Sequence, residues 1–413
     1  MSQSSTGGLS MPRAVPADVR RARIAVSVIF AAHGAVAGTF ATRIPWIADH
    51  VRTDPGGLGL ALLFASVGAL IAMPFTGRLI HRMPARLAVP VLMVPWCFAV
   101  IPTALAPSVP LLCVALFVYG ATSGAADVAM NAQGVVVEQA YGRSIMSGLH
   151  GMWSLGGLAG SGLGVLAAFA DISAPRHFLL VSAFLAAGSV AVSRWLIDAE
   201  PPAAEAEMPA FVLPPRPVVL IALVGFMAVF GEAASADWAA VYLTDIAHAA
   251  PAVAAAAYSG FAATMAIARL AGDRVVNRFG AVRTVRLGGV AATAGALLVV
   301  VSRSPVPAII GFALIGVGVA VVVPLAFAAA GNAGPRPAQQ IAGVATIVYG
   351  AGLAAPASIG GIAHVTSLSA SFVVVAALAA LIVFGASALR PRAKLADGSR
   401  PFSDDRRKLS TVD

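Results

Sequence analysis

Residues 309–330 read IIGFALIGVGVAVVVPLAFAAA, a stretch without a charged side chain in which glycines and one proline are the only breaks. A helix that spans a bilayer needs about 20 predominantly apolar residues. Comparable runs occupy residues 290–301 and 372–389. Of the 413 residues, 59% are hydrophobic and only 11% are charged, whereas soluble domains carry about 25% charged residues. The sequence therefore predicts an all-α integral membrane protein.

Twelve apolar segments are long enough to be transmembrane helices. They occupy residues 21–47, 57–79, 86–106, 110–139, 144–170, 175–197, 217–246, 252–279, 283–303, 305–331, 337–365 and 367–389. If the N-terminus lies inside the cell, only four of the 27 Lys and Arg residues fall on the outer side of the membrane: Arg43, Arg52, Arg176 and Arg303. Cytoplasmic loops carry the excess of Lys and Arg, so a multi-pass inner-membrane protein with both termini in the cytoplasm is expected.

The net charge of +9 is explained by the Lys and Arg residues of the predicted cytoplasmic segments. The basic residues form short clusters between apolar runs and do not alternate with aromatic residues on a soluble face. The sequence therefore predicts membrane lipid, and not nucleic acid, as the neighbour of these clusters.

A polar, proline-rich segment at 198–216 separates two halves of six predicted helices each. The expected organisation is a cytoplasmic tail (1–20), a bundle (21–197), a cytoplasmic linker (198–216), a second bundle (217–389) and a basic cytoplasmic tail (390–413). The halves share a weak repeat, because RLIHRMPA at 78–85 matches RVVNRFGA at 274–281 with an offset of 196. Parallel six-helix repeats around a central site are typical of transporters that rock between two states.

The repeated basic turn resembles the loop signature of the major facilitator superfamily, roughly G-x-L-x-D-R-x-G-R-R, and the resemblance extends from about residue 21 to 390. It implies twelve transmembrane helices in two pseudo-symmetric six-helix bundles. The chain departs from the signature at His81, which stands at the Asp position, and at Asn277 in the second copy. The first half therefore lacks the usual acidic anchor of that turn.

Four segments resemble the branch of this superfamily that contains the MosC-like and YbjJ-like inner-membrane proteins. They are TRIP at 42–45, DVAMN at 127–131, LHGMWSLGG at 149–157, and Glu232 followed by Asp237-Trp238. The branch implies a sugar-like or cyclitol-like solute. The fifth predicted helix lacks the Gly-Pro pair typical of drug/proton antiporters, which disfavours an efflux pump.

Ionised side chains inside a membrane helix are costly and usually functional. On the fourth predicted helix, Asp127 and Asn131 lie on a stripe of polar and small residues along an otherwise apolar helix. Helix packing through small residues would give a similar stripe, but a buried carboxylate is a poor means of packing. A solute or proton site is therefore favoured for Asp127.

Five further residues are candidates for the solute or proton pathway. On the fifth helix, His150 shares a stripe with Ser154, Gly157, Ser161 and Gly164. The spacing of Gly156, Gly160 and Gly164 favours close helix packing. His150 itself is equally compatible with a core histidine and with a solute or proton contact. The other four, which lie in the first and seventh helices, are His33, Arg43, Glu232 and Asp237.

Each of these four has an alternative. Arg43 could reach the membrane interface or balance a carboxylate or anionic solute, and His33 could simply pack against a neighbouring helix. Glu232 and Asp237 are about 140° apart around their helix, so they are expected to have different partners. Glu232 is favoured for the cavity because it lies nearer the middle of its helix.

A cytoplasmic gate is expected near the repeated basic turns, with an ion pair between Arg269 and Asp273. Its candidate residues are Arg78, Arg82, Glu138, Arg269, Asp273 and Arg278. No Walker loop, dinucleotide fingerprint or metal-ligand cluster occurs in the sequence, so no enzymatic activity, ATP coupling, cofactor or metal is expected.

A carboxylate in a membrane cavity can be neutral or charged at accessible pH, so a proton gradient is the favoured energy source. The favoured function is a proton-coupled symporter that works as a monomer. Facilitated diffusion, a proton-driven exporter or antiporter, and a transport-inactive scaffold or sensor remain as alternatives.

Overall fold

The computed structural model describes residues 16–80, 82–142, 145–198, 214–333 and 337–390, without the side chains of Arg78, Ser147, Asp273, Pro337 and Ala338. This part of the chain is helical, contains no strand, and includes twelve helices long and apolar enough to cross a membrane. The all-α membrane fold predicted from the sequence is confirmed.

The first half runs through α1 to α8. Its helices are α1 (Ala17–Ala41), α2 (Ile44–Val51), α3 (Pro55–Ile80), α4 (Ala85–Phe98), α5 (Ile101–Leu105), α6 (Val109–Tyr141), α7 (Met146–Phe169) and α8 (Ala174–Ser193). The short helix α5 completes the span begun by α4.

The second half begins with a short 3₁₀ turn. Its elements are η1 (Arg216–Val218), α10 (Val219–Asp245), α11 (Pro251–Phe279), α12 (Ala281–Val301), α13 (Pro305–Val319), α14 (Val322–Gly331), α15 (Pro337–Val365), α16 (Leu368–Gly385) and η2 (Ala386–Leu389).

The first predicted helix, 21–47, is wrong as a single element. α1 begins at Ala17 and ends at Ala41, and the separate helix α2 starts at Ile44. Pro45 lies at the start of α2; in an unbroken helix its ring would clash with the carbonyl group of Ala41 and it would have no N–H to donate. The break places Arg43 in the bend between the two helices.

The two halves repeat one packing scheme. In the first half α1 packs on α7, α3 on α6 and α4 on α8; in the second, α10 packs on α15, α11 on α13 and α12 on α16. These are equivalent pairs when α1 is matched with α10, so the two six-helix bundles are pseudo-symmetric as predicted. The turns after α3 and after α11 lie at the same end of the molecule.

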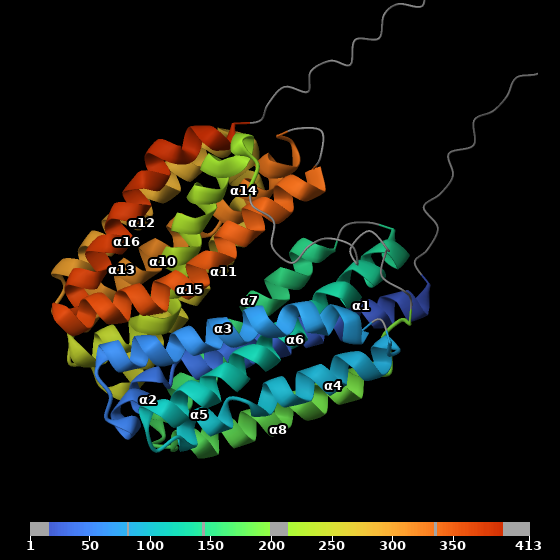
Figure 1. Cartoon of the computed structure of the whole chain (residues 1–413), viewed down its shortest axis with the longest axis horizontal. Helices are drawn as coiled ribbons and strands as arrows, with labels where there is room; N and C mark the ends of the chain where they lie inside the picture. Colours follow the sequence, from blue (N-terminus) through green and yellow to red (C-terminus); the bar gives the residue numbers. More distant parts are fainter. Residues whose placement is uncertain (1–15, 81, 143–144, 199–213, 334–336, 391–413) are drawn as a thin grey trace, which may run out of the picture.

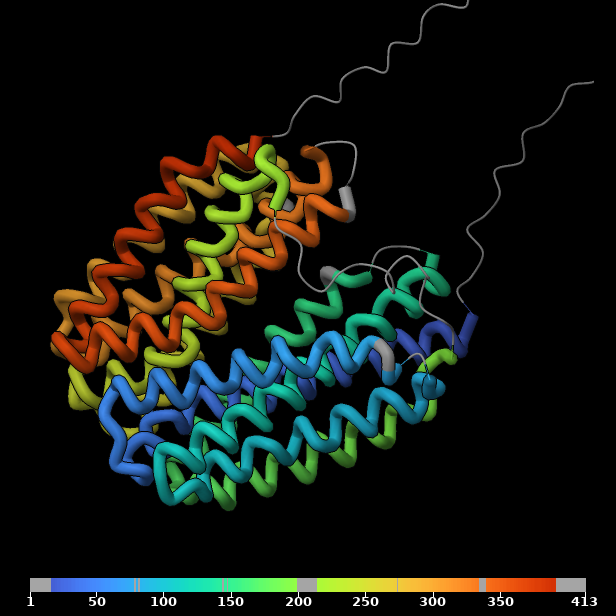
Figure 2. The backbone as a smooth tube through the Cα atoms, in the orientation of Figure 1, coloured from blue at the N-terminus to red at the C-terminus, as the bar shows by residue number. Residues whose placement is uncertain are grey.

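The bundles meet at one end and separate toward the other (Figures 1 and 2). We call the end that holds residues 16, 198, 214 and 390 the linker end, and the opposite end, where α3 starts and α15 finishes, the closed end. Contacts between bundles run mainly through α3 with α15 and α7 with α11. Near the closed end α3 and α15 touch through their backbones, since a Cβ on Gly360 would lie 2.7 Å from the Cα of Gly59.

Backbone contact also joins α1 to α7. A Cβ on Gly156 would lie 1.9 Å from the Ala31 carbonyl oxygen, and one on Gly160 would lie 2.1 Å from that of Ala35. The glycine stripe predicted on the fifth span therefore packs against a neighbouring helix.

Large apolar side chains cover the outside. Phe169, Phe184 and Phe384 are 79%, 76% and 76% exposed, a surface that suits lipid rather than water.

Candidate solute and proton site

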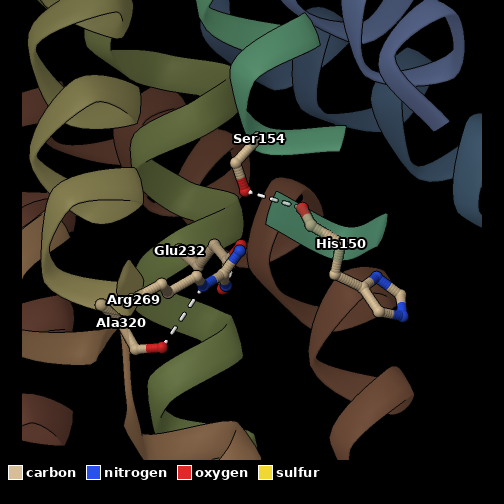
Figure 3. Close-up of polar contacts among 5 residues, drawn as sticks. All are labelled: His150, Ser154, Glu232, Arg269 and Ala320. Carbon is tan, nitrogen blue, oxygen red and sulfur yellow. Dashed lines mark hydrogen bonds and ion pairs between the residues drawn. The ribbon is translucent and has the colours of Figure 1, made fainter. Parts of the chain in front are cut away.

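An ion pair between Glu232 of α10 and Arg269 of α11 lies on the side of the second bundle that faces the first. The guanidinium Nη2 is 3.1 Å from Oε1 and 3.2 Å from Oε2, and Nε donates to the Ala320 carbonyl oxygen at 3.3 Å (Figure 3). Both side chains are roughly three-quarters buried, with 29% and 25% of their surface exposed. Each charge therefore has its counter-charge within the same bundle, as side chains in a membrane region require.

The first bundle brings Asp127, Asn131 and His150 to the facing side. Asn131 Nδ2 donates to the Asp127 carbonyl oxygen at 2.9 Å, and its amide also bonds to the Asp127 side chain. The imidazole of His150 interacts electrostatically with Asp127 and is exposed. Asp127 therefore has a titratable partner but no fixed cation among the residues described.

The two sets face each other. His150 is also within electrostatic reach of Arg269, and Asp127 is within reach of Tyr349 on α15. In Figure 3, Ser154 lies nearer the Glu232–Arg269 pair, while the His150 imidazole extends away from it. Five helices, two from the first bundle and three from the second, thus contribute polar side chains to one region.

Asp237 lies one and a half turns further along α10 than Glu232. It interacts electrostatically with Tyr258 of α11 and, in the first bundle, with Tyr119 of α6. No hydrogen bond or ion pair to the Asp237 carboxylate is found among the described residues. Both acids interact electrostatically with Tyr258, but Glu232 has a cation beside it and Asp237 has none among the described residues.

Two of the predicted pathway residues lie inside the first bundle. His33 Nδ1 accepts from Trp153 Nε1 at 3.0 Å and its Nε2 donates to the Ser123 carbonyl oxygen at 3.2 Å, so the ring is held in one neutral tautomer. Arg43, 5% exposed, donates to His177 Nδ1 at 3.3 Å and to the Ile172 carbonyl oxygen at 2.9 Å. Neither residue joins the site between the bundles.

The predicted gate residues do not form one group. Glu138 Oε2 accepts from the backbone N–H groups of Ile145 and Met146 at 2.6 and 2.9 Å, at the start of α7. Arg82 and Arg278 are exposed near the linker end. The side chains of Arg78 and Asp273 lie outside the described residues, and with them the predicted Arg269–Asp273 pair; Arg269 itself lies beside Glu232.

Sequence reasoning missed the tyrosines. Tyr119, Tyr258 and Tyr349 lie near the acids, yet none carries a charge that would distinguish it within an apolar helix. Tyr258 and Arg269 fall on the same face of their helix, about three turns apart, and this shared face was the available signal.

The fold and this region define a class: a multi-pass membrane protein with two six-helix bundles and ionisable groups between them, the architecture of a secondary transporter. A family model described as "Major Facilitator Superfamily" matches residues 26–352. The chain belongs to the major facilitator superfamily, as its basic turns suggested.

Three relatives share most of their length with it. The "Uncharacterized transporter y4wD" of Sinorhizobium fredii is 34% identical over 368 residues, which cover 88% of this chain and 97% of the relative. An uncharacterized MFS-type transporter of Yersinia pestis is 33% identical, with 89% and 94% covered. The "Membrane protein MosC" of Rhizobium meliloti is 28% identical, with 87% and 88% covered, which bears out the resemblance to that branch.

Solved structures with the same fold include the nucleoside transporter NupG. A point mutant of that transporter superposes with a TM-score of 0.70 at 10% identity, covering 89% of this chain and 99% of that one. A second NupG structure gives a TM-score of 0.67 at 12% identity, with 91% and 99% covered. At these identities the likeness concerns the fold alone.

Proposed function

We propose that the protein is a proton-coupled secondary transporter of a small polar, sugar-like or cyclitol-like solute, and that the solute binds between the bundles and the halves rock around it. The observation that carries the proposal is the placement of Asp127 beside His150, opposite the Glu232–Arg269 pair. A transport-inactive scaffold has no use for ionisable groups on the facing surfaces of its two halves.

Asp127 is the proposed coupling carboxylate. It has no fixed counter-cation among the described residues, so its charge depends on His150, on the Asn131 amide and on any water that enters between the bundles. Closing the bundles over it would remove that water, and its affinity for a proton would change with the conformation. Such a difference couples a proton gradient to solute movement. Glu232 is already neutralised by Arg269 and is the less suitable proton carrier.

The distribution of Lys and Arg supports an inner-membrane location with the linker end in the cytoplasm. On that orientation the proposed symporter, working as a monomer, faces inward in this arrangement and has its closed end on the outside. Export and facilitated diffusion are the competing outcomes of the test.

The test begins with purified protein and a panel of monosaccharides, inositols and nucleosides. A compound that binds the folded state raises the temperature of unfolding, and radiolabelled uptake of that compound is then followed in proteoliposomes. With a proton gradient directed inward, the parent should accumulate it. Asp127→Asn should still exchange it between the two compartments but should fail to accumulate it.

Asp171→Asn is the matched control. Asp171 is an exposed acid in the α7–α8 turn with a φ of 53°, a conformation that Asn tolerates well. This variant should accumulate solute like the parent. Accumulation by Asp127→Asn at the parental level would remove the proton role from Asp127. If the parent accumulates solute only when the proton gradient is directed outward, the protein exchanges solute for protons and is an exporter.

A further inference from the structure

One ion pair joins the two bundles among the residues that the structure describes. The Asp54 Oδ2 atom lies 2.6 Å from Nδ1 of His364. Asp54 directly precedes α3 of the first bundle, and His364 is in the last turn of α15 of the second. The other two ion pairs described, Arg86–Asp198 and Glu232–Arg269, each lie within one bundle. The basic partner in the pair between bundles is thus a histidine, which carries a charge only when its imidazole is protonated.

The carboxylate of this pair is held in position. Asp54 Oδ1 accepts from the backbone N–H of Gly57 at 2.8 Å, at the first turn of α3. This hydrogen bond, aided by that with His364, keeps the pKa of Asp54 below its ordinary value. Asp54 therefore stays ionised through the range in which imidazole titrates.

The position of the imidazole is set by the helix crossing. A Cβ on Gly56 would lie 2.9 Å from the His364 Cβ, and a Cβ on Gly59 would lie 2.7 Å from the Pro356 carbonyl oxygen. Because the backbones of α3 and α15 touch here, the pair can form only while the closed end is closed.

We propose that Asp54 and His364 form a pH-sensitive latch that holds the two bundles together at the closed end. A protonated His364 gives a charge-assisted bond to Asp54, whereas a neutral one gives an ordinary hydrogen bond. Acid supplies the charge-assisted form of this bond, so we expect acid to favour the closed arrangement and alkali to loosen it. Both side chains are more than half exposed, at 59% and 52%, so water screens the bond and its contribution is that of an exposed ion pair.

The charged groups around the latch either favour closure in acid, as the latch does, or lie too far from Asp54 to act on its carboxylate. Asp49 of α2 and Asp245 of α10 interact as like charges across the bundles, and His248 attracts Asp245. His50 stacks on Trp46 within α2, and α16 has no charged residue. Of these groups, only His364 acts on the Asp54 carboxylate. Protonation of an aspartate in the Asp49–Asp245 pair would relieve repulsion and also favour closure.

The assignment of the latch to the outside rests on the proposed orientation, but its test needs neither a solute nor proton coupling. Spin labels at Ser173→Cys and Ser304→Cys report the separation of the bundles, because both residues are exposed in turns at the closed end. Cys97 and Cys113, both buried, are replaced by alanine. Distances are measured by double electron–electron resonance in nanodiscs at about pH 5.5 and about pH 8, on either side of the ordinary histidine pKa.

The closed-to-open ratio of the parent should fall about two- to fivefold between these pH values, the size expected for an exposed charge pair. In His364→Gln, which keeps a hydrogen-bond donor but cannot titrate, most of this change with pH should be lost, and only the part due to Asp49 and Asp245 should remain. Asp54→Asn should behave likewise, and it retains the helix cap because Asn caps as well as Asp.

His248→Gln is the matched control, since it removes a neighbouring histidine at the same end, and it should keep the parental pH dependence. A parent whose distances do not change with pH, or a His364→Gln variant with the full parental change, would overturn the latch. A failure of Asp127→Asn to affect accumulation would leave the latch untouched, so the two proposals are tested separately.

Discussion

At the scale of single residues, the acids of α10 show how a neighbour decides what a carboxylate does. Glu232 has a guanidinium against both oxygens, and Asp237 has two tyrosines in electrostatic reach and no cation described beside it. A buried charge without a partner carries a desolvation cost, whereas a paired charge leaves a costly cation behind when it is removed.

The two acids should therefore respond in opposite ways to loss of charge. Glu232→Gln should lower the free energy of unfolding by about 1–3 kcal/mol, because Arg269 loses its counter-charge. Asp237→Asn should leave stability unchanged in acid and raise it by about 1 kcal/mol at alkaline pH, where the parent must bury an ionised group. Thermal unfolding in detergent across pH measures both. A stabilised Glu232→Gln or a strongly destabilised Asp237→Asn would contradict this view of the site.

Sequence reasoning identified the acids but not their partners. The cost of a charge in a membrane helix made Asp127, Glu232 and Asp237 visible. Arg269 was expected to pair with Asp273, one helical turn away, because only contacts along one helix follow from periodicity. Its contact with Glu232 depends on how α10 packs against α11, and that packing is set by many small contacts.

At the scale of elements, glycines decide how closely helices approach. α7 presents Gly156 and Gly160 to α1, where the helix backbones touch, while Gly162 of the same helix has open space around its α-carbon. The spacing of the first two glycines predicted this contact. The bend between α1 and α2 was not predicted, although Pro45 was visible, because membrane helices often continue through proline, as α3 does at Pro74.

A pair of alanine substitutions on α7 tests the contact. Gly160→Ala should destabilise the protein by about 1–3 kcal/mol, since the new methyl group would meet the Ala35 carbonyl oxygen. Gly162→Ala should be neutral or stabilising by about 0.5–1 kcal/mol, because alanine favours helix over glycine. Unfolding temperatures of the two purified variants make the comparison, and equal effects would mean that α1 and α7 do not touch here.

At the scale of the whole molecule, the number of spans, the two halves and their repeat all followed from the sequence. They depend on apolar length and on a repeated turn, both of which are local. The separation of the bundles at the linker end could not be predicted, because hydrophobic patterning is the same in every state of a rocking transporter.

The proposed orientation makes a direct prediction about access from outside the cell. In a background without Cys97 and Cys113, a cysteine at Pro107, exposed in the α5–α6 turn at the closed end, should react with a membrane-impermeant maleimide in intact cells. A cysteine at Ala204 in the linker segment should react only after the membrane is permeabilised. The reverse pattern would invert the topology and place the latch in the cytoplasm.

The crossing of α3 and α15 also has a mechanical consequence. Gly59 and Gly360 touch without side chains between them. The two helices can therefore rotate about this contact point, and few side chains have to repack when they do. The part of α3 (Pro55–Ile80) that lies beyond Gly59 is about 30 Å long at 1.5 Å per residue and acts as a lever. A turn of about 10° at the contact point would carry the far end of this lever through about 5 Å, the rise of one helical turn. A displacement that barely disturbs the glycines would thus open or shut a passage wide enough for a small molecule.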